Sequence, residues 1–328
     1  MAEGVMRAVR IAKPGGPEVL ELVERPLPVP GAGEVRVRVA ASGVNRADLI
    51  QRRGRYPAPP GWPADIPGLE YAGTVEVVGE GVSLEPGQRV MGIVGGGGYA
   101  EAVVVREREV VRAPEGMDPL AAGAVPEVFM TAWDALFTQM GLTAGETVLV
   151  HAAGSGVGTA AVQLARAAGA RVIGTSRTPE KLHRAAALGL EVGVAGAEWP
   201  DAVLEATGGE GADVILDLVG APYLAGNLKA LAQRGRWIVV GVTGGSAGEI
   251  DMRLLMGKRA SLKGTVLRAR PPEERMALAR DFERRVVPLF ERGVLQPVVD
   301  RTFAPEAVAD AHRLMEEDRT FGKLLIAW

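Results

Sequence analysis

The sequence contains no cysteine and only three histidines, His151, His183 and His312, among its 328 residues. Without cysteine, the chain can form no disulfide, no thiolate nucleophile and no cysteine-ligated zinc site. Three histidines are also too few for a histidine-rich metal centre. We expect His151, which follows a buried strand, to be structural, and His183 and His312 to lie on helix surfaces.

Long hydrophobic runs and a strong charge of one sign are also missing. No stretch approaches the roughly 18 apolar residues of a transmembrane helix. The first residues, MAEGVMRAVRIAKPGG, contain no apolar run of signal-peptide length. The formal net charge is −3, and no polybasic segment stands out. These features predict a cytoplasmic protein that has neither nucleic acid nor a membrane as its partner.

The length fits two domains, and the two parts of the chain differ in pattern. Residues 1 to about 120 resemble short strands between glycine- and proline-containing turns. Val35, Val37 and Val39 alternate with charged residues, as in a half-buried strand. This pattern predicts an all-β domain, a barrel or compact sandwich.

From about residue 125, apolar strands alternate with helical segments. This alternation predicts a parallel sheet with helices on both faces, so the fold class is α/β. The predicted strands are Thr147–Val150, Val172–Thr175, Val214–Leu218 and Trp237–Gly241. Towards the end of the chain, the pattern predicts a long helix over Glu273–Arg292 and strands over Val298–Phe303 and Lys323–Ile326.

The segment VLVHAAGSGVGTAAVQLARAAGA, residues 148–170, carries the strongest functional signal. A strand runs into a glycine-rich turn, which opens a helix. Small residues let the backbone approach a pyrophosphate, and the helix N-terminus offers it N–H groups. The spacing departs from GxGxxG, because Ala153, Ser155 and Gly158 occupy the three fingerprint positions. The repeated β-α context nevertheless predicts a dinucleotide site.

The end of the second strand indicates which dinucleotide binds. NAD enzymes carry an Asp or Glu there for the ribose hydroxyls. Here Ser176 stands at the tip, and Arg177 and Lys181 supply positive charge. An acid would repel a 2′-phosphate, whereas this arrangement would pair with one. NADPH is therefore the predicted cofactor.

The segment GLEYAGTVEVVGEGV, residues 68–82, resembles the GHExxGxxxxxGxxV pattern of zinc alcohol dehydrogenases. Leu69 replaces the zinc-binding histidine of that pattern. In the segment GVNRAD, Asn45 replaces a zinc-binding cysteine, and Glu127 matches the third ligand position. Leu and Asn are not ordinary zinc ligands, so no metal is predicted. Asp48 is matched in the zinc enzymes and could orient a loop.

The loss of these ligands is itself the pattern of a zinc-free branch. The chain resembles the quinone oxidoreductase (zeta-crystallin-like) branch of the medium-chain dehydrogenase/reductase superfamily, including its stress-inducible members. The segments that carry the resemblance are KPGGPEVLEL, NRADLIQRRGRYPAPP, PEVFMTAW and GKLLI. The resemblance implies a GroES-like β-barrel catalytic domain over residues 1–125, a Rossmann NADPH-binding domain over 126–268 and a C-terminal return to the catalytic domain over 269–328. It also implies a homodimer or homotetramer.

The resemblance further implies which residues meet the cofactor. Thr131 should approach the nicotinamide, and Ser176, Arg177 and Lys181 should take the 2′-phosphate. A tyrosine that often assists there in the family aligns with Gly196. The other implied positions are Gly154, Ser155, Gly156, Val157 and Gly158 at the pyrophosphate, Gly241, Val242 and Thr243 along the cofactor, and Val266, Leu267, Arg268 and Lys323 closing over it.

The expected reaction is hydride transfer from NADPH to a quinone or conjugated carbonyl. Without zinc as a Lewis acid, the acceptor oxygen needs hydrogen-bond donors. Asn45 and Tyr56 are the best candidates, and Tyr56 or water would deliver the proton. Alternatively, Asn45 is a turn residue, Tyr56 a packing aromatic and Glu127 a residual carboxylate facing the cleft.

Two other functions remain open on the same scaffold. One is an NADPH-dependent alkenal or enoyl-thioester reductase. An acyl-CoA substrate would need a basic entrance, which Arg52, Arg53 and Arg55 could provide, although a solvated loop is an equally simple interpretation. The other is a cofactor-binding protein with a structural or RNA-binding role.

Overall fold

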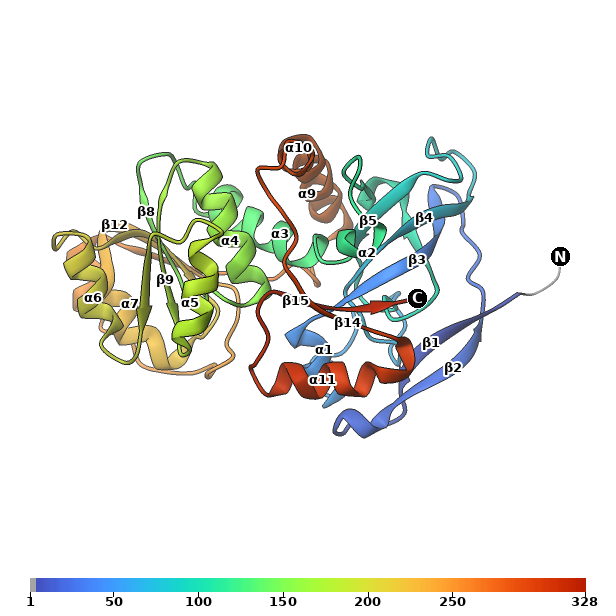
Figure 1. Cartoon of the computed structure of the whole chain (residues 1–328), viewed down its shortest axis with the longest axis horizontal. Helices are drawn as coiled ribbons and strands as arrows, with labels where there is room; N and C mark the ends of the chain where they lie inside the picture. The colour runs from blue at the N-terminus through green and yellow to red at the C-terminus, as the bar shows by residue number, and fades with distance from the viewer. Residues whose placement is uncertain (1–3) are drawn as a thin grey trace. The chain divides into compact units, whose positions relative to one another are not determined.

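The computed structural model describes residues 4–328, and the contacts divide the chain into two units (Figure 1). The first unit extends to Met130 and resumes over Leu267–Trp328, and the second is Thr131–Val266. Residues 126–130, Leu267 and Arg268, which were expected in the nucleotide-binding domain, therefore belong to the first unit.

The first unit is built on one large sheet, as the alternating valines predict. Its strands follow the order β14-β15-β3-β4-β5-β7, with β6 paired to β3. Val35, Val37 and Val39 point into the core and are buried. The unit is the expected GroES-like domain. Its strands are β3 (Glu34–Val44), β4 (Glu70–Val78), β5 (Arg89–Ile93), β6 (Ala102–Arg106), β7 (Val111–Arg112), β14 (Val299–Phe303) and β15 (Lys323–Ala327), and a hairpin joins β1 (Val5–Ile11) and β2 (Leu20–Pro26).

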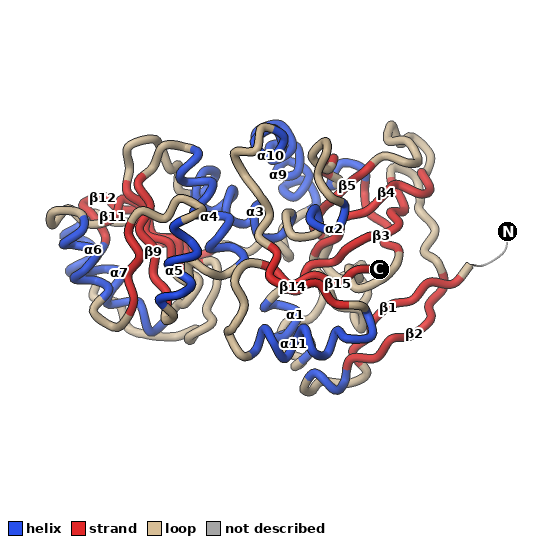
Figure 2. Tube along the Cα trace, viewed as in Figure 1, coloured by secondary structure: helices blue, strands red, loops and turns tan. Residues whose placement is uncertain are grey.

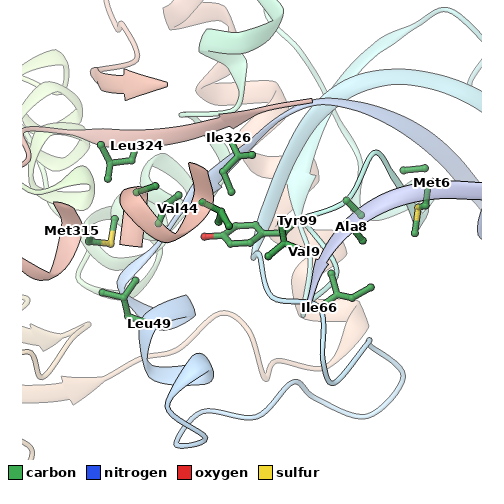
Figure 3. Packing of buried hydrophobic residues seen from close by; sticks show 14 residues of the cluster. Met6, Ala8, Val9, Val44, Leu49, Ile66, Tyr99, Met315, Leu324 and Ile326 are labelled. Carbon is green, nitrogen blue, oxygen red and sulfur yellow. The ribbon is translucent and has the colours of Figure 1, made fainter. Parts of the chain in front are cut away.

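The chain's C-terminal segment completes the first unit. Strand β15 pairs antiparallel with β3, so that Leu324 lies opposite Val44. Figure 3 shows both residues in one hydrophobic cluster that surrounds the ring of Tyr99. The unit's helices are α1 (Arg46–Arg52), α2 (Pro119–Ala122), α3 (Pro126–Trp133, which runs across the boundary), α9 (Pro272–Arg285), α10 (Val287–Glu291) and α11 (Val308–Glu316).

The second unit is a Rossmann sheet, as the β-α alternation predicts. Its strand order is β10-β9-β8-β11-β12-β13, and its strand pairs are parallel. Figure 2 shows helices on both sides of these strands. The strands are β8 (Thr147–Val150), β9 (Arg171–Ser176), β10 (Val192–Ala195), β11 (Ala212–Asp217), β12 (Leu231–Val239) and β13 (Ser261–Gly264); the helices are α4 (Gly156–Ala167), α5 (Pro179–Ala186), α6 (Trp199–Ala206), α7 (Leu224–Ala230) and α8 (Met252–Lys258).

The strand order places a switch point beside β8. The chain passes from β8 to β9 on one side, whereas β11 pairs with the other side of β8. In open parallel sheets, ligands bind at such a point, outside the carboxyl ends of the strands. The turn after β8 is therefore where the topology itself would place a dinucleotide.

Two predictions about helices need correction. The helix predicted over Glu273–Arg292 ends at Arg285, and α10 follows, because Pro288 lacks the N–H that a continuous helix needs there. His312 lies on α11 but is buried, not on the helix surface. Within residues 4–328, no helix is both long and apolar enough to cross a membrane.

Candidate functional site

The glycine-rich turn between β8 and α4 has the form of a pyrophosphate cradle. Ser155 is the N-cap of α4, and its Oγ accepts a hydrogen bond from the Gly158 N–H at 3.0 Å. Ala152 adopts a left-handed conformation, with φ of 51°. A Cβ on Gly158 would lie 2.3 Å from the Ala152 carbonyl oxygen, so only glycine fits there.

The residues of this turn fit a dinucleotide. The tight approach of Gly158 to the backbone of Ala152 and Ala153 in the turn lets the main chain come close to a bound group. Helix α4 is 12 residues long and begins at this turn, so its dipole and unpaired N–H groups favour a phosphate anion. The predicted turn residues Gly154, Ser155, Gly156, Val157 and Gly158 thus lie together at the carboxyl end of β8.

The end of β9 carries positive charge and lacks an acid at its tip. Ser176 is the last residue of β9, and its Oγ accepts from the Thr178 N–H at 3.1 Å. Arg177 is exposed and Lys181 is half-buried on α5. Tyr223 lies close enough to Arg177 for the guanidinium to lower the pKa of the phenol, although burial raises it more. The local sequence around Tyr223 carries no signal that would predict its place beside Arg177.

The remaining predicted cofactor residues of the second unit occupy separate positions. Gly241, Val242 and Thr243 follow β12, where the Thr243 hydroxyl donates to the Leu218 carbonyl oxygen at 2.9 Å. Thr131 is buried on α3, and Val266 is exposed after β13. The structure therefore places these residues on different elements of the unit.

His151 directly follows β8, and its buried side chain belongs to a hydrogen-bond network. Asn227 donates its amide to Asp217 at 2.9 Å, so its Oδ1 accepts from His151 Nε2 at 2.6 Å. Nδ1 of His151 then accepts from the Thr175 hydroxyl at 2.8 Å. Burial lowers the pKa of His151 to about 4, against the raising effects of Asp217 and Asn227. The imidazole is therefore neutral and couples the ends of β8 and β9.

The first unit has its own polar cluster, which joins Asn45, Glu70 and Lys323. Lys323 Nζ lies 2.7 Å from Glu70 Oε1 and donates to Asn45 Oδ1 at 2.6 Å. Asn45 Nδ2 donates to the same Glu70 oxygen at 2.8 Å. A Cβ on Gly43 would lie 2.1 Å from Glu70 Oε1, so a residue other than glycine at this position would displace the Glu70 side chain. Asn45 and Lys323 were predicted to have separate roles, and no role was predicted for Glu70.

A second network fixes helix α1, which follows Asn45. Asp48 accepts the Asn45 N–H at 2.8 Å and the Tyr99 hydroxyl at 3.0 Å. Because Arg52 can only donate to His312 Nδ1 (3.2 Å), Nε2 of His312 carries the hydrogen and donates to Tyr99 at 3.2 Å. Burial raises the pKa of Asp48 to about 6, although these hydrogen bonds oppose the rise.

This network also corrects the interpretation of the arginine cluster. Arg52 is fully buried, where it donates to the Gly15 carbonyl oxygen and pairs with Glu316. It therefore cannot act as a basic entrance for a substrate, whereas Arg53 and Arg55 are exposed. Asp48 orients the start of α1, in line with the loop-orienting alternative.

Tyr56, Arg268 and Glu127 carry the other polar groups near this cluster. The Arg268 guanidinium lies 4.7 Å from the centre of the Tyr56 ring and donates to Gln51 Oε1 and the Gly95 carbonyl oxygen. Burial raises the pKa of the half-buried Tyr56; Arg268 opposes this rise, and Glu127 adds to it. Arg268, predicted to close over the cofactor, is thus anchored within the first unit.

The positions that bind zinc in the related enzymes do not fit zinc here. Leu69 offers no ligand atom, and the Asn45 amide is held by Glu70 and Lys323. An ammonium group beside these positions would also repel a cation. Among residues 4–328, no three His, Asp or Glu side chains are arranged to hold a metal ion together.

Comparison with known proteins gives a consistent result over the whole chain. Family models described as "Alcohol dehydrogenase GroES-like domain" and "Zinc-binding dehydrogenase" match residues 31–115 and 156–284. A quinone oxidoreductase from Lama guanicoe is 36% identical over 340 residues, covering 99% of each chain. A solved structure of an NAD-dependent alcohol dehydrogenase is 36% identical, with a TM-score of 0.89 over 98% of this chain and 100% of the other. The JamJ enoyl reductase is 26% identical, with a TM-score of 0.86 over 98% of this chain and 99% of the other.

Proposed function

The chain belongs to the quinone oxidoreductase branch of the medium-chain dehydrogenase/reductase superfamily, and from this premise we propose that it reduces quinones with NADPH and without zinc. It is a nicotinamide-dinucleotide-dependent oxidoreductase. The proposal of NADPH and of zinc-free chemistry is supported by two features that occur in the same chain. The polar cluster around Asn45 does not suit zinc, and the end of β9, at Ser176 and Arg177, carries positive charge.

The preference for NADPH is supported by the end of β9. Ser176 occupies the tip where an acid would select NAD, and the cations at Arg177 and Lys181 suit a phosphate. Ser155 and Gly158 would hold the pyrophosphate at the N-terminus of α4. When bound, the nicotinamide supplies the hydride. The exposed side chains of Val242, in the segment after β12, and Val266, in the segment after β13, would cover the cofactor.

The acceptor oxygen is proposed to bind at Tyr56 and Asn45. The Tyr56 hydroxyl can donate a hydrogen bond, and the Arg268 guanidinium beside its ring adds positive charge near the developing oxyanion. Asn45 Nδ2 already donates to Glu70 Oε1 at 2.8 Å and to the Gly43 carbonyl oxygen at 3.3 Å. Binding of the acceptor by Asn45 therefore requires exchange of the longer of these two bonds, whereas the Tyr56 hydroxyl and the Arg268 charge are in place without such an exchange. Preorganised groups of this kind stabilise charge without reorganising during the reaction.

A second candidate function is reduction of an alkenal or enoyl thioester. The full-length likeness to an enoyl reductase favours it, since the scaffold is shared and the pocket decides the substrate. The hydride would then reach the β-carbon of the conjugated carbonyl, and the same Tyr56 hydroxyl would serve the oxygen.

The oligomeric state is proposed to be a homodimer. Strand β13 pairs with β12 and with no other strand in residues 4–328, and all four of its residues are exposed. An open edge that carries the exposed Leu262 can extend its sheet by pairing with another copy. Sedimentation of the purified protein tests this point directly.

The test of function is oxidation of NADPH and NADH by chelator-treated protein. The acceptors are a panel of quinones, enals and enoyl thioesters. Turnover of quinones that prefers NADPH and resists chelation supports the proposal. Turnover of enals or thioesters alone would move the function to the second candidate, and absence of NADPH binding would contradict both.

A further inference from the structure

Glu127 lies beside the polar cluster of the first unit, and the proposed reaction does not yet use it. It follows Pro126 at the start of α3, and its backbone N–H donates to Glu70 Oε2 at 2.8 Å. This hydrogen bond fixes the main chain of Glu127 against the cluster of Glu70, Asn45 and Lys323. Of the three positions that match zinc ligands of the related enzymes, Asn45, Leu69 and Glu127, it is the only one that carries a carboxyl group.

The Lys323 ammonium group has no hydrogen left to donate to the Glu127 carboxyl group. Lys323 directs its ammonium group to the Val44 carbonyl oxygen, Asn45 Oδ1 and Glu70 Oε1, at 2.9, 2.6 and 2.7 Å. An ammonium group has three hydrogens, so these contacts use all of them. The charges of Lys323 and Glu70 therefore largely neutralise each other.

The carboxyl group of Glu127 has an unfilled hydrogen-bonding position. Its Oε2 atom is buried and has no hydrogen-bond partner among the residues that the structure describes. An ionised carboxylate in such a place would be strongly unfavourable, and the group adopts its neutral form instead. A neutral carboxylic acid has one O–H to donate.

The surrounding charges lead to the same protonation state. Burial is the largest cause that raises the pKa of Glu127, the Glu70 carboxylate is the next, and the resulting pKa is about 8. The groups that face it come from several elements: Glu70 on β4, Asp48 on α1, Lys323 on β15, Arg268 before α9 and Tyr56 after α1. The carboxylates raise its pKa, and Lys323 and Arg268 lower it without overcoming burial.

We propose that Glu127 is a catalytic acid of this enzyme, which donates its proton to the oxygen of the conjugated carbonyl or quinone acceptor. The proposal rests on the function proposed above. Under this proposal the proton comes from Glu127 and not from Tyr56 or water. Tyr56 polarises the acceptor oxygen by a hydrogen bond, and Glu127 protonates it.

The proton and electron balance is simple. The acceptor gains a hydride from the reduced nicotinamide dinucleotide, and the π-electron pair of its conjugated system moves onto the carbonyl oxygen. A bond forms between that oxygen and the proton as the O–H bond of Glu127 breaks. The resulting carboxylate regains a proton from water before the next turnover. The acceptor is reduced by two electrons, and the dinucleotide is oxidised by two.

The first test replaces Glu127 by Gln, which keeps the shape but cannot give up a proton. In wild type, kcat should fall as the pH rises through about 8. In Glu127→Gln, kcat should be lower by about 10²-fold or more and should lose this dependence, while the Kd for NADPH stays within about twofold. Glu127→Asp keeps an acid and should recover part of kcat together with the alkaline limb.

A second readout needs no substrate or cofactor. The infrared carbonyl band of a buried carboxylic acid should be present in wild type at pH 7, above the pKa of about 6 of the buried Asp48. It should vanish with a midpoint near pH 8, and at pH 7 it should be largely lost in Glu127→Gln. Glu109→Gln is the matched control, because it makes the same substitution at a buried side chain that is paired with Arg275, and it should leave the band unchanged.

The outcomes separate the two proposals. Absence of the band in wild type would overturn the role of Glu127 whatever the activity. A band with unchanged kcat and pH dependence in Glu127→Gln would also overturn it. Wild-type protein that reduces no quinone, enal or thioester would overturn the proposed function and the proton transfer with it, even if the infrared titration shows an acid at Glu127.

Discussion

Lys323 and Glu70 form a fully buried ion pair, with 2.7 Å between Nζ and Oε1, although they lie on strands from opposite ends of the chain. Their side chains are 4% and 0% exposed. Since β15 reaches the first unit only after the chain has passed through the second, this pair ties the C-terminal segment to the N-terminal sheet. It also sets the charge at the site where the related enzymes bind zinc.

Removing one partner of this pair should strongly destabilise the first unit. Lys323→Met leaves Glu70 buried and unpaired, which should lower the free energy of unfolding by about 3–5 kcal/mol. Urea unfolding measures the change. Arg313→Met is the control, because its pair with Asp310 is 51% and 64% exposed and should contribute less than about 1 kcal/mol. Equal losses in both variants would contradict the importance of the buried pair.

A methyl group at Gly158 should strongly weaken dinucleotide binding without unfolding the protein. Its Cβ would lie 2.3 Å from the Ala152 carbonyl oxygen, so the turn would have to shift. We expect the Kd for NADPH, measured by nucleotide fluorescence, to rise by about 100-fold, or roughly 2.7 kcal/mol.

Gly257→Ala is the control for the Gly158 variant. Gly257 is helical, and a Cβ there would meet nothing within 4 Å, so alanine should stabilise α8 slightly. Unchanged NADPH binding in Gly158→Ala would mean that the turn does not cradle the pyrophosphate.

Charge removal at the end of β9 should change the choice of dinucleotide. Arg177→Ala should weaken NADPH binding by about tenfold, or about 1.4 kcal/mol, and leave NADH binding within about twofold. Comparing the two Kd values separates loss of the 2′-phosphate contact from general damage. Arg184→Ala, which removes an exposed arginine from α5, should change neither. Equal weakening for both dinucleotides would contradict a phosphate contact at Arg177.

The sequence predicts those features that are local or periodic. The alternation of Val35, Val37 and Val39 indicates β3, and the strand, turn and helix around Gly158 indicate the nucleotide site. Both depend on neighbours in the chain, so the pattern is visible without the fold. The break at Pro288 was missed because apolar spacing continued beyond it, although proline lacks the N–H that a helix needs.

The polar cluster was harder to predict because its members are far apart in sequence. Glu70 and Lys323 meet only through the pairing of β15 with β3 and of β3 with β4. The same applies to His312. Its position in a helical segment predicts an exposed side chain, but Tyr99 and Arg52, which are distant in sequence, contact its ring and bury it. Residue type marks such groups as polar, but only the topology brings them together.

The buried His312 should make the protein less stable in acid. Burial lowers its folded-state pKa to about 3, and Arg52 adds to this shift, whereas the ordinary value is 6.5. Between these values the unfolded chain binds more protons than the folded one, so stability falls as the pH drops below about 6.5.

The contribution of His312 can be isolated by comparing wild type with His312→Gln. Gln does not titrate, so the difference in unfolding free energy between the two should shift in favour of the variant from pH 7 to pH 4. His183→Gln is the control, because His183 is exposed. A difference that stays constant with pH would show that His312 is not buried in its neutral form.

Tyr56 and Asn45 should contribute to kcat/KM in different ways. Tyr56→Phe removes a single hydroxyl, and we expect kcat/KM for a quinone to fall by about tenfold, or about 1.4 kcal/mol of transition-state stabilisation. Asn45→Ala removes an acceptor from Lys323 and a donor from Glu70. It should therefore lower both the activity and the free energy of unfolding, the latter by about 1–3 kcal/mol.

If both variants kept kcat/KM within about twofold of wild type, neither residue would bind the acceptor oxygen. If Asn45→Ala lost stability while only Tyr56→Phe lost activity, Asn45 would serve to position Lys323 and Glu70, and Tyr56 alone would bind the oxygen.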